Sequence, residues 1–121
     1  TEGFKNYFST ILSIAKANNI TPFTVKINND HSRKNSFAKR YFQGENLEHA
    51  IKRDKKITQL HNSIMDSIST ANGVKVIPFN EFQPSSQSYW YDNCHLTEAG
   101  IREKAIFIGE YLIRESKIPK N

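Results

Sequence analysis

The side chains of this sequence whose types and spacing could do chemistry are Asp92 and His95, three positions apart in the run YDNCHLTEAG at residues 91–100. In a nucleophilic triad, a carboxylate orients an imidazole ring and the ring takes a proton from the nucleophile. The Asp-x-x-His spacing lets the carboxylate contact one ring nitrogen and leaves the other free for that proton. We therefore interpret Asp92 and His95 as the orienting residue and the general base of a triad whose nucleophile must be found elsewhere.

The elements on either side of this run are predicted from periodicity. Apolar side chains at helical spacing predict helices over residues 3–18 and 45–72 and after residue 97. Segments rich in β-branched and aromatic side chains predict strands over residues 21–27 and 74–79. This alternation is the α/β pattern, in which parallel strands are joined by crossover helices and reactive groups collect at the carboxyl ends of the strands. Because the run follows the second strand, it is expected at that edge.

Two parallel strands by themselves make a poor sheet. Such strands are normally buried on both faces, and the first strand here would leave one edge unpaired. The predicted fold class is therefore α/β, with residues 1–121 forming a single partial domain: the C-terminal half of a doubly wound, flavodoxin-like parallel sheet, with two strands and three main helices in this chain. The start at Thr1 rather than Met agrees with a processed product, an excised segment or the trailing part of a longer polypeptide.

Each predicted helix carries a stripe of apolar side chains that is expected to face the core. The stripes consist of Phe4, Phe8, Ile11, Leu12 and Ala15 in the first helix, Ile57, Leu60, Ile64 and Ile68 in the second, and Ile101, Ala105, Ile108 and Leu112 in the third. The second helix is predicted to stop at Asn72-Gly73. Thr97 is predicted to be the N-cap of the third helix, and Gly100 to let its first turn pack closely.

The remaining candidate ligands and nucleophiles have simpler interpretations. Cys94 could be a nucleophile or, with His95, half of a metal site, but with no third ligand recognised we interpret it as a small buried side chain and expect no metal and no cofactor. His31, His49 and His61 have no partner at ligand spacing and are interpreted as solvated surface histidines. A single cysteine excludes an internal disulfide and leaves the compartment open. No apolar run approaches the roughly 20 residues of a membrane span.

The net charge of +5 comes from one segment. Residues 31–56 contain eight Lys or Arg and three acidic residues, whereas the rest of the chain has nine of each sign. Such a patch can attract anions, but no recognition motif for nucleic acid accompanies it, so nucleic-acid binding is not favoured. Lining of a substrate cleft is preferred, since this segment follows the first strand. Phe37, Tyr41 and Trp90 could contact a sugar or acyl group there, although packing is the preferred interpretation of each.

The run DNCHLTEAG at residues 92–100 strongly resembles the last conserved block of the SGNH, or GDSL-type, hydrolases, which reads Asp-x-x-His-Leu-Thr-x-x-Gly before the terminal helix. The resemblance extends more weakly to residues 18–25 and 72–79, which look like the segments of the family's fourth and fifth strands. It therefore covers essentially the whole chain, as the C-terminal half of that fold.

The resemblance implies that His95 activates a serine and that Asp92 holds His95. The family's Gly-Asp-Ser motif and the Gly and Asn blocks of its oxyanion hole do not occur here, and Asn28-Asn29-Asp30 lacks the Gly and follows the wrong strand. The implied function is the C-terminal portion of a serine esterase for carboxylic esters, especially acetyl esters such as acetylated carbohydrates. The N-terminal half of the same protein, or another chain, would complete the sheet and supply the serine. The alternatives left open are a non-catalytic half-domain that binds a partner chain and, more weakly, an anion- or nucleic-acid-binding domain that uses the basic segment.

Overall fold

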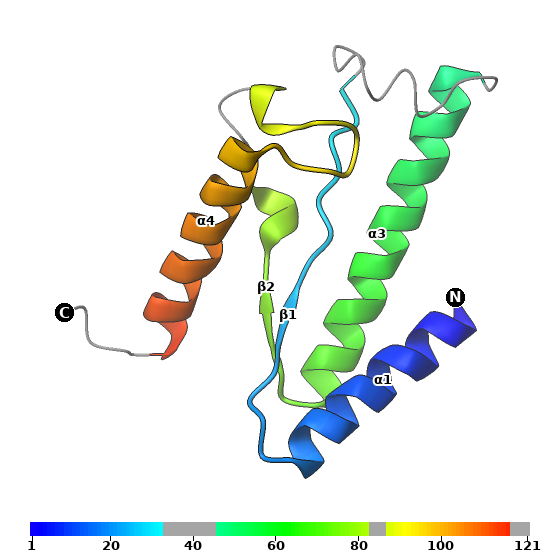
Figure 1. The fold of residues 1–121 in the computed structure, drawn as a ribbon. Coiled ribbons are helices and arrows are strands. Elements are labelled where there is room, and N and C mark those ends of the chain that lie inside the picture. Colours follow the sequence, from blue (N-terminus) through cyan, green and yellow to red (C-terminus); the bar gives the residue numbers. More distant parts are fainter. Residues whose placement is uncertain (33–45, 83–86, 117–121) are drawn as a thin grey trace.

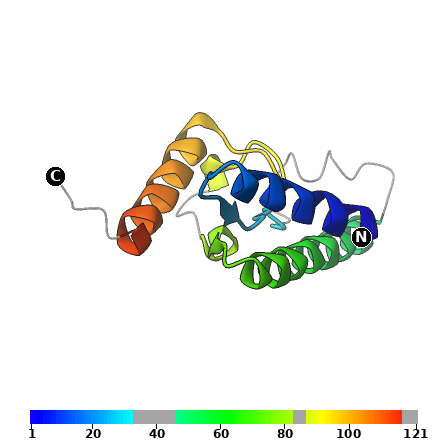
Figure 2. The same cartoon turned by 90° about the horizontal axis from the view of Figure 1, so that it is seen from below.

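The computed structural model describes residues 1–32, 46–82 and 87–116 and has a mixed α/β fold, as predicted. Three α-helices and a parallel pair of strands make up this part of the chain. The elements are α1 (Glu2–Ala17), β1 (Phe23–Val25), α3 (Leu47–Ala71), β2 (Lys75–Ile77), α4 (Glu98–Ser116) and the 3-10 turns η1 (Phe79–Glu81) and η2 (Gln87–Tyr89). Figures 1 and 2 show α1 and α3 together on one side of the strand pair and α4 on the other.

The two strands are parallel and shorter than predicted. Phe23 pairs with Lys75 and Val25 with Ile77, and the N–H of Lys26 extends the ladder with a bond to the carbonyl of Ile77. The pairing cannot continue far. Pro78, directly after β2, has no N–H to donate, and the backbone of Ile27 is bonded to a side chain of α3 instead of a strand.

The ends of α3 follow from its capping residues. At the start, the side chain of Asn46 accepts hydrogen bonds from the backbone N–H groups of Glu48 and His49. At the other end, Gly73 adopts a φ of +64°, a left-handed conformation that glycine takes without strain. The predicted stop at Asn72-Gly73 is therefore confirmed.

The predicted stripe on α1 and that on α3 are each partly wrong. On α1, Leu12 is buried but Ile11 is 62% exposed. On α3, Ile64 is buried while Ile57 and Leu60 are exposed, and Thr58, Met65 and Ser69 are buried with it. The buried face of α3 is more polar than the predicted stripe. A hydroxyl group can be buried there when it is hydrogen-bonded, as in the 2.8 Å bond between Thr24 of β1 and Ser69 of α3.

On α4 the predicted stripe lies largely outside the core. Ile101 is 57% exposed and Ala105 is exposed as well. The helix instead packs through its aromatic residues: Phe107 meets Phe79 and Phe82 edge-on, with ring centroids 5.9 and 5.7 Å apart, and the hydroxyl of Tyr111 donates to the carbonyl of Val76 in β2. Periodicity correctly predicted the helix, but several of its apolar side chains have no neighbour to cover them among the described residues.

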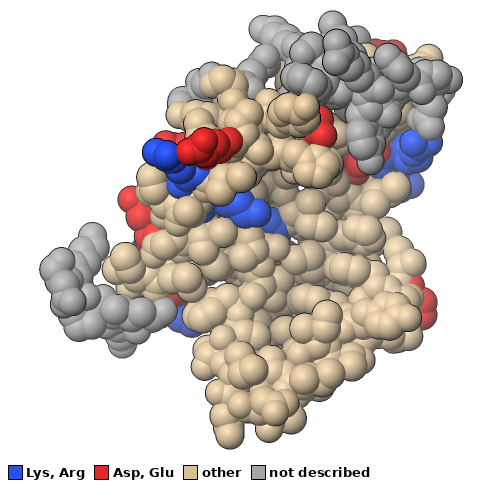
Figure 3. Space-filling model, in the orientation of Figure 1, with Lys and Arg blue, Asp and Glu red and all other residues tan. Residues whose placement is uncertain are grey.

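Apolar side chains are also exposed on the other helical layer. In Figure 3 the lower part of the molecule, over α1 and the turn into β1, is almost free of charged side chains. Exposed apolar residues of this part of the chain include Tyr7, Ile11, Ile14 and Ile20.

Within the described ranges, no helix is both long enough and apolar enough to cross a membrane.

Asn62 ties the end of β1 to α3, and its loss has a predictable cost. Its side-chain oxygen accepts from the N–H of Ile27 and its side-chain NH₂ donates to the carbonyl of Ile27, each at 2.8 Å. Because an Asn62→Ala variant leaves two part-buried backbone groups without these partners, we expect about 1–3 kcal/mol less stability in urea unfolding. Ser63→Ala, at an exposed position of the same helix, should change stability by no more than about 0.5 kcal/mol. Equal unfolding midpoints for the two variants would contradict the role assigned to Asn62.

Candidate active site

The segment that carries Asp92 and His95 is closed into a tight loop before α4. Trp90 and Leu96 form an antiparallel bridge, and inside it the N–H of Tyr91 donates to the carbonyl of His95 at 2.8 Å. Trp90 is buried, in agreement with the packing interpretation of this side chain. The loop therefore has a defined shape that its own backbone maintains.

Within the loop, the carboxylate of Asp92 makes the contacts expected of an orienting residue. One oxygen, Oδ1, accepts hydrogen bonds from the backbone N–H groups of Cys94 and His95 at 2.9 and 2.7 Å. The other, Oδ2, lies 2.6 Å from Nδ1 of His95. The Asp92 side chain is only 16% exposed, whereas that of His95 is 70% exposed. Nδ1 therefore faces the carboxylate, and Nε2 is the nitrogen of this exposed ring that could exchange a proton.

The electrostatics of Asp92 favour its charged form. Burial by itself acts to raise the pKa of the carboxyl, but the hydrogen bonds from the Cys94 backbone, the His95 ring and the His95 backbone outweigh it and lower the pKa to about 2. Asp92 is therefore a carboxylate at any pH near neutrality, and it can orient the ring and stabilise an imidazolium.

Thr97 and Gly100 join this loop to α4. The Thr97 hydroxyl accepts from the N–H of Gly100 at 3.3 Å, as the predicted N-cap should, and donates to the carbonyl of Ser88 at 2.8 Å. Gly100 is buried, and a Cβ atom at this position would overlap the carbonyl oxygen of Tyr89. Close packing of the first turn at Gly100 is thus confirmed.

Cys94 is exposed, so the prediction of a buried side chain is wrong. The buried place in the loop is taken by Asn93, which is 2% exposed. The Cys94 sulfur lies 3.5 Å from Nδ1 of His95. Partial burial raises the pKa of its thiol to about 11, and the negative charges of Asp92 and Asp54 act in the same direction.

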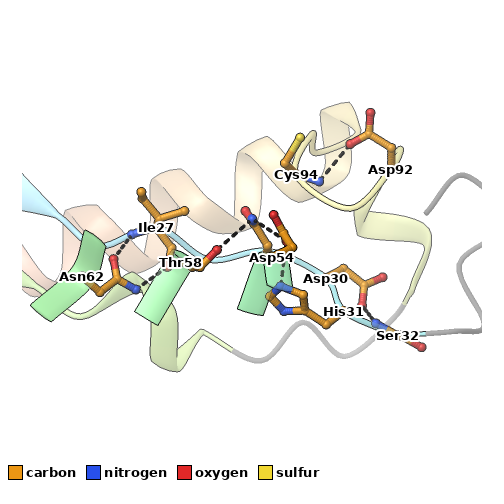
Figure 4. Close-up of polar contacts among 10 residues, drawn as sticks. Ile27, Asp30, His31, Ser32, Asp54, Thr58, Asn62, Asp92 and Cys94 are labelled. Carbon is orange, nitrogen blue, oxygen red and sulfur yellow. Dashed lines mark hydrogen bonds and ion pairs between the residues drawn. The ribbon is translucent and has the colours of Figure 1, made fainter. Parts of the chain in front are cut away.

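A polar network between α3 and the segment that follows β1 lies beside the loop (Figure 4). The N–H of Asp30 donates to the carbonyl of Asn93 at 2.8 Å. One residue on, Nε2 of His31 lies 2.8 Å from a carboxylate oxygen of Asp54 in α3. The interpretation of His31 as a solvated histidine is therefore wrong, because its partner is 23 positions away in sequence and could not be recognised by ligand spacing.

The other two histidines differ from each other. His49 is exposed, as predicted, whereas His61 is half-buried, and its ring lies tilted by 31° against that of Phe4, at 4.6 Å between centroids. Phe37 and Tyr41 lie outside the described residues, as does much of the basic segment.

Two hollows adjoin the loop. One, of about 280 Å³, opens beyond the carboxyl ends of the strands and is lined by Asn28, Asn29, Trp90, Cys94 and Lys104 among others. The second, of about 500 Å³, is shared by Cys94, His95 and Leu96 with Ile101, Ala105 and Ile108 of α4. His95 thus borders a hollow that is mostly apolar and is also lined by Lys104. Sequence reasoning assigned no role to Asp54 or Lys104. It considered Asn29 only as part of Asn28-Asn29-Asp30, and the position of that residue after the predicted strand was the available signal.

The described residues thus combine an α/β fold with an Asp–His pair placed after β2. Comparison with models of protein families, with curated proteins and with solved structures finds no match to this chain.

Proposed function

We propose that this chain is the C-terminal portion of a serine esterase of the SGNH type, acting on carboxylic esters such as acetylated carbohydrates. The observation that carries the proposal is the 2.6 Å contact between Asp92 Oδ2 and His95 Nδ1, on an exposed ring, after β2 and before α4. The capping of α4 by Thr97 and the close packing at Gly100 add support, since both positions belong to the motif that carries the resemblance.

The proposed chemistry uses His95 twice. Nε2 takes the proton of a serine hydroxyl while the serine oxygen attacks the ester carbonyl, and Asp92 stabilises the imidazolium that forms. The ring then gives that proton to the leaving alcohol, which leaves an acyl-enzyme. Nε2 then takes a proton from water as the water oxygen attacks the acyl carbon, and it gives that proton to the serine oxygen as the acid is released. The serine and the oxyanion-hole donors lie outside this chain.

The same proposal accounts for the apolar surface of α4. A doubly wound, flavodoxin-like sheet would add strands beside β1 and helices against the exposed side of α4. Ile101, Ala105 and Ile108 line the hollow next to His95. A segment that filled this hollow could bring its serine to Nε2 while it covered these side chains.

The test is ester hydrolysis by the polypeptide that contains this chain together with the proposed serine-bearing half. We expect turnover of p-nitrophenyl acetate and covalent labelling by a fluorophosphonate, which reacts with activated serines. Neither is expected of residues 1–121 alone. Absence of both hydrolysis and labelling in the longer polypeptide would contradict the proposal.

A second candidate function is a non-catalytic half-domain that binds a partner chain. Each strand of the pair has one neighbour among the described residues, and apolar side chains such as Ile11 and Ile101 are exposed. A single measurement separates the two functions. A stable, inert 14.0 kDa monomer that remains unlabelled when mixed with the serine-bearing half favours the module over the enzyme.

A further inference from the structure

We propose that Asp92, Cys94 and His95 also form a binding site for a transition-metal dication of the Zn²⁺ class, and that the bound metal prevents His95 from acting as a base. The three side chains offer a carboxylate oxygen, a sulfur and an imidazole nitrogen, and these ligand atoms all lie within 4.8 Å of one another. Carboxylate, thiolate and imidazole are the donors from which zinc sites are built. Metal binding does not depend on the proposed esterase function; only inhibition of hydrolysis rests on it.

The observed spacing is close to what a tetrahedral ion needs. With zinc about 2.0–2.3 Å from each ligand atom, tetrahedral neighbours stand about 3.3–3.6 Å apart. The Cys94 sulfur already lies 3.5 Å from Nδ1 of His95. The Asp92–His95 contact of 2.6 Å has to open, by less than about 1 Å on the same geometry, and the Asp92 oxygen lies within 4.8 Å of the Cys94 sulfur. The exposure of His95 leaves a fourth position for water.

The carboxylate of Asp92 supplies negative charge at the site, while Lys104 lines both adjoining hollows together with Cys94. Asp92 is anionic near neutral pH, and both its charge and that of Asp54 act on Cys94 and oppose ionisation of the thiol. Among the three ligands, the Asp92 carboxylate is the charge that would attract a dication.

The proton balance links metal binding to loss of base function. The Cys94 thiol releases one proton to solvent when its sulfur binds the metal. The His95 proton leaves Nδ1, which now binds the metal, and a proton is taken up at Nε2, so the ring contributes no net release. Nε2 is then an N–H donor and can no longer accept a proton from serine. Metal and proton transfer are therefore mutually exclusive at this ring.

Titration of the tag-free chain with Co²⁺, a spectroscopic probe for zinc sites, tests the binding. We expect four-coordinate visible bands, a near-ultraviolet thiolate-to-cobalt charge-transfer band, and release of one proton per metal in calorimetry. Cys94→Ser should abolish the charge-transfer band and weaken binding at least tenfold, whereas His49→Ala, at an exposed position on α3, should titrate like the unchanged chain. A wild-type titration without the charge-transfer band, or a Cys94→Ser titration indistinguishable from wild type, would overturn the site.

Inhibition is measured separately, in the polypeptide used for hydrolysis. Zn²⁺ should inhibit p-nitrophenyl acetate turnover, and Cys94→Ser should raise the half-inhibitory Zn²⁺ concentration at least tenfold. If the polypeptide hydrolyses the ester but Co²⁺ does not bind, the metal site is contradicted and the proposed esterase function is supported. If Co²⁺ binds as expected but the polypeptide does not hydrolyse esters, the metal site is supported and the proposed esterase function is contradicted.

Discussion

Hydrolysis of p-nitrophenyl acetate should fall by about 10⁴-fold or more when His95 is replaced by alanine in the polypeptide that unites this chain with the proposed serine-bearing half. The loss is large because the proposed serine is not nucleophilic at neutral pH without a base, and His95 is the ring that Asp92 orients at 2.6 Å. The loss should appear mainly in kcat, since proton transfer takes place in the transition state and the substrate's ground-state contacts are not removed.

The matched control for this variant is His49→Ala, which removes an exposed histidine from α3. It should leave kcat and KM within about twofold of the unchanged polypeptide, because a surface substitution of this kind perturbs little. Fluorophosphonate labelling should be lost in His95→Ala and retained in the control. A His95→Ala polypeptide that folds and hydrolyses at the original rate would remove His95 from the mechanism.

Gly100→Ala should destabilise the chain strongly, by about 3 kcal/mol or more, although it adds a single methyl group. A Cβ atom at this position would overlap the Tyr89 carbonyl oxygen and lie 3.0 Å from its carbonyl carbon and 3.1 Å from a methyl group of Leu96. The Tyr89 carbonyl cannot easily withdraw, because it accepts the N–H of Thr97 at 2.9 Å. Thermal unfolding followed by circular dichroism measures the effect.

Gly109→Ala provides the control on the same helix. Nothing lies within 4 Å of a Cβ added at Gly109, so the variant should gain about 0.5–1 kcal/mol from the better helix propensity of alanine. The two substitutions are chemically identical, but they should change stability in opposite directions because the surroundings of the two glycines differ. If Gly100→Ala proved as stable as Gly109→Ala, the close approach of α4 to Tyr89 would not exist in solution.

The features of the fold that could be predicted are those set by local chemistry. The helix stop at Gly73 requires a left-handed conformation, and the cap at Thr97 requires a hydroxyl at a helix start. The contact of Asp92 with His95 is likewise local, since the two residues are three positions apart. Residues close in sequence determine such features, so the order of residues is sufficient to predict them.

Features that depend on the packing of distant elements could not be predicted. Periodicity placed Ile57 and Ile101 on apolar faces but could not say which face has a neighbour, and both are exposed. The pairing of His31 with Asp54 joins the segment after β1 to α3 and depends on how the two elements pack. Cys94 was misjudged because a small apolar residue is usually buried, whereas in this loop Asn93 occupies the interior.

The hydrogen bonds within the loop before α4 have a consequence for how activity would arise. The contacts that fix Asp92 and His95 come largely from residues 88–100, including the Trp90–Leu96 bridge and the cap at Thr97. The Asp92–His95 pair would therefore be fully formed before any serine approaches. If the serine arrives on a separate chain, catalysis becomes second-order: the rate would rise with the concentration of both pieces, and dilution would switch it off without unfolding either. Such a chain could serve as one component of a split reporter, in which ester hydrolysis reports that two fused proteins have met.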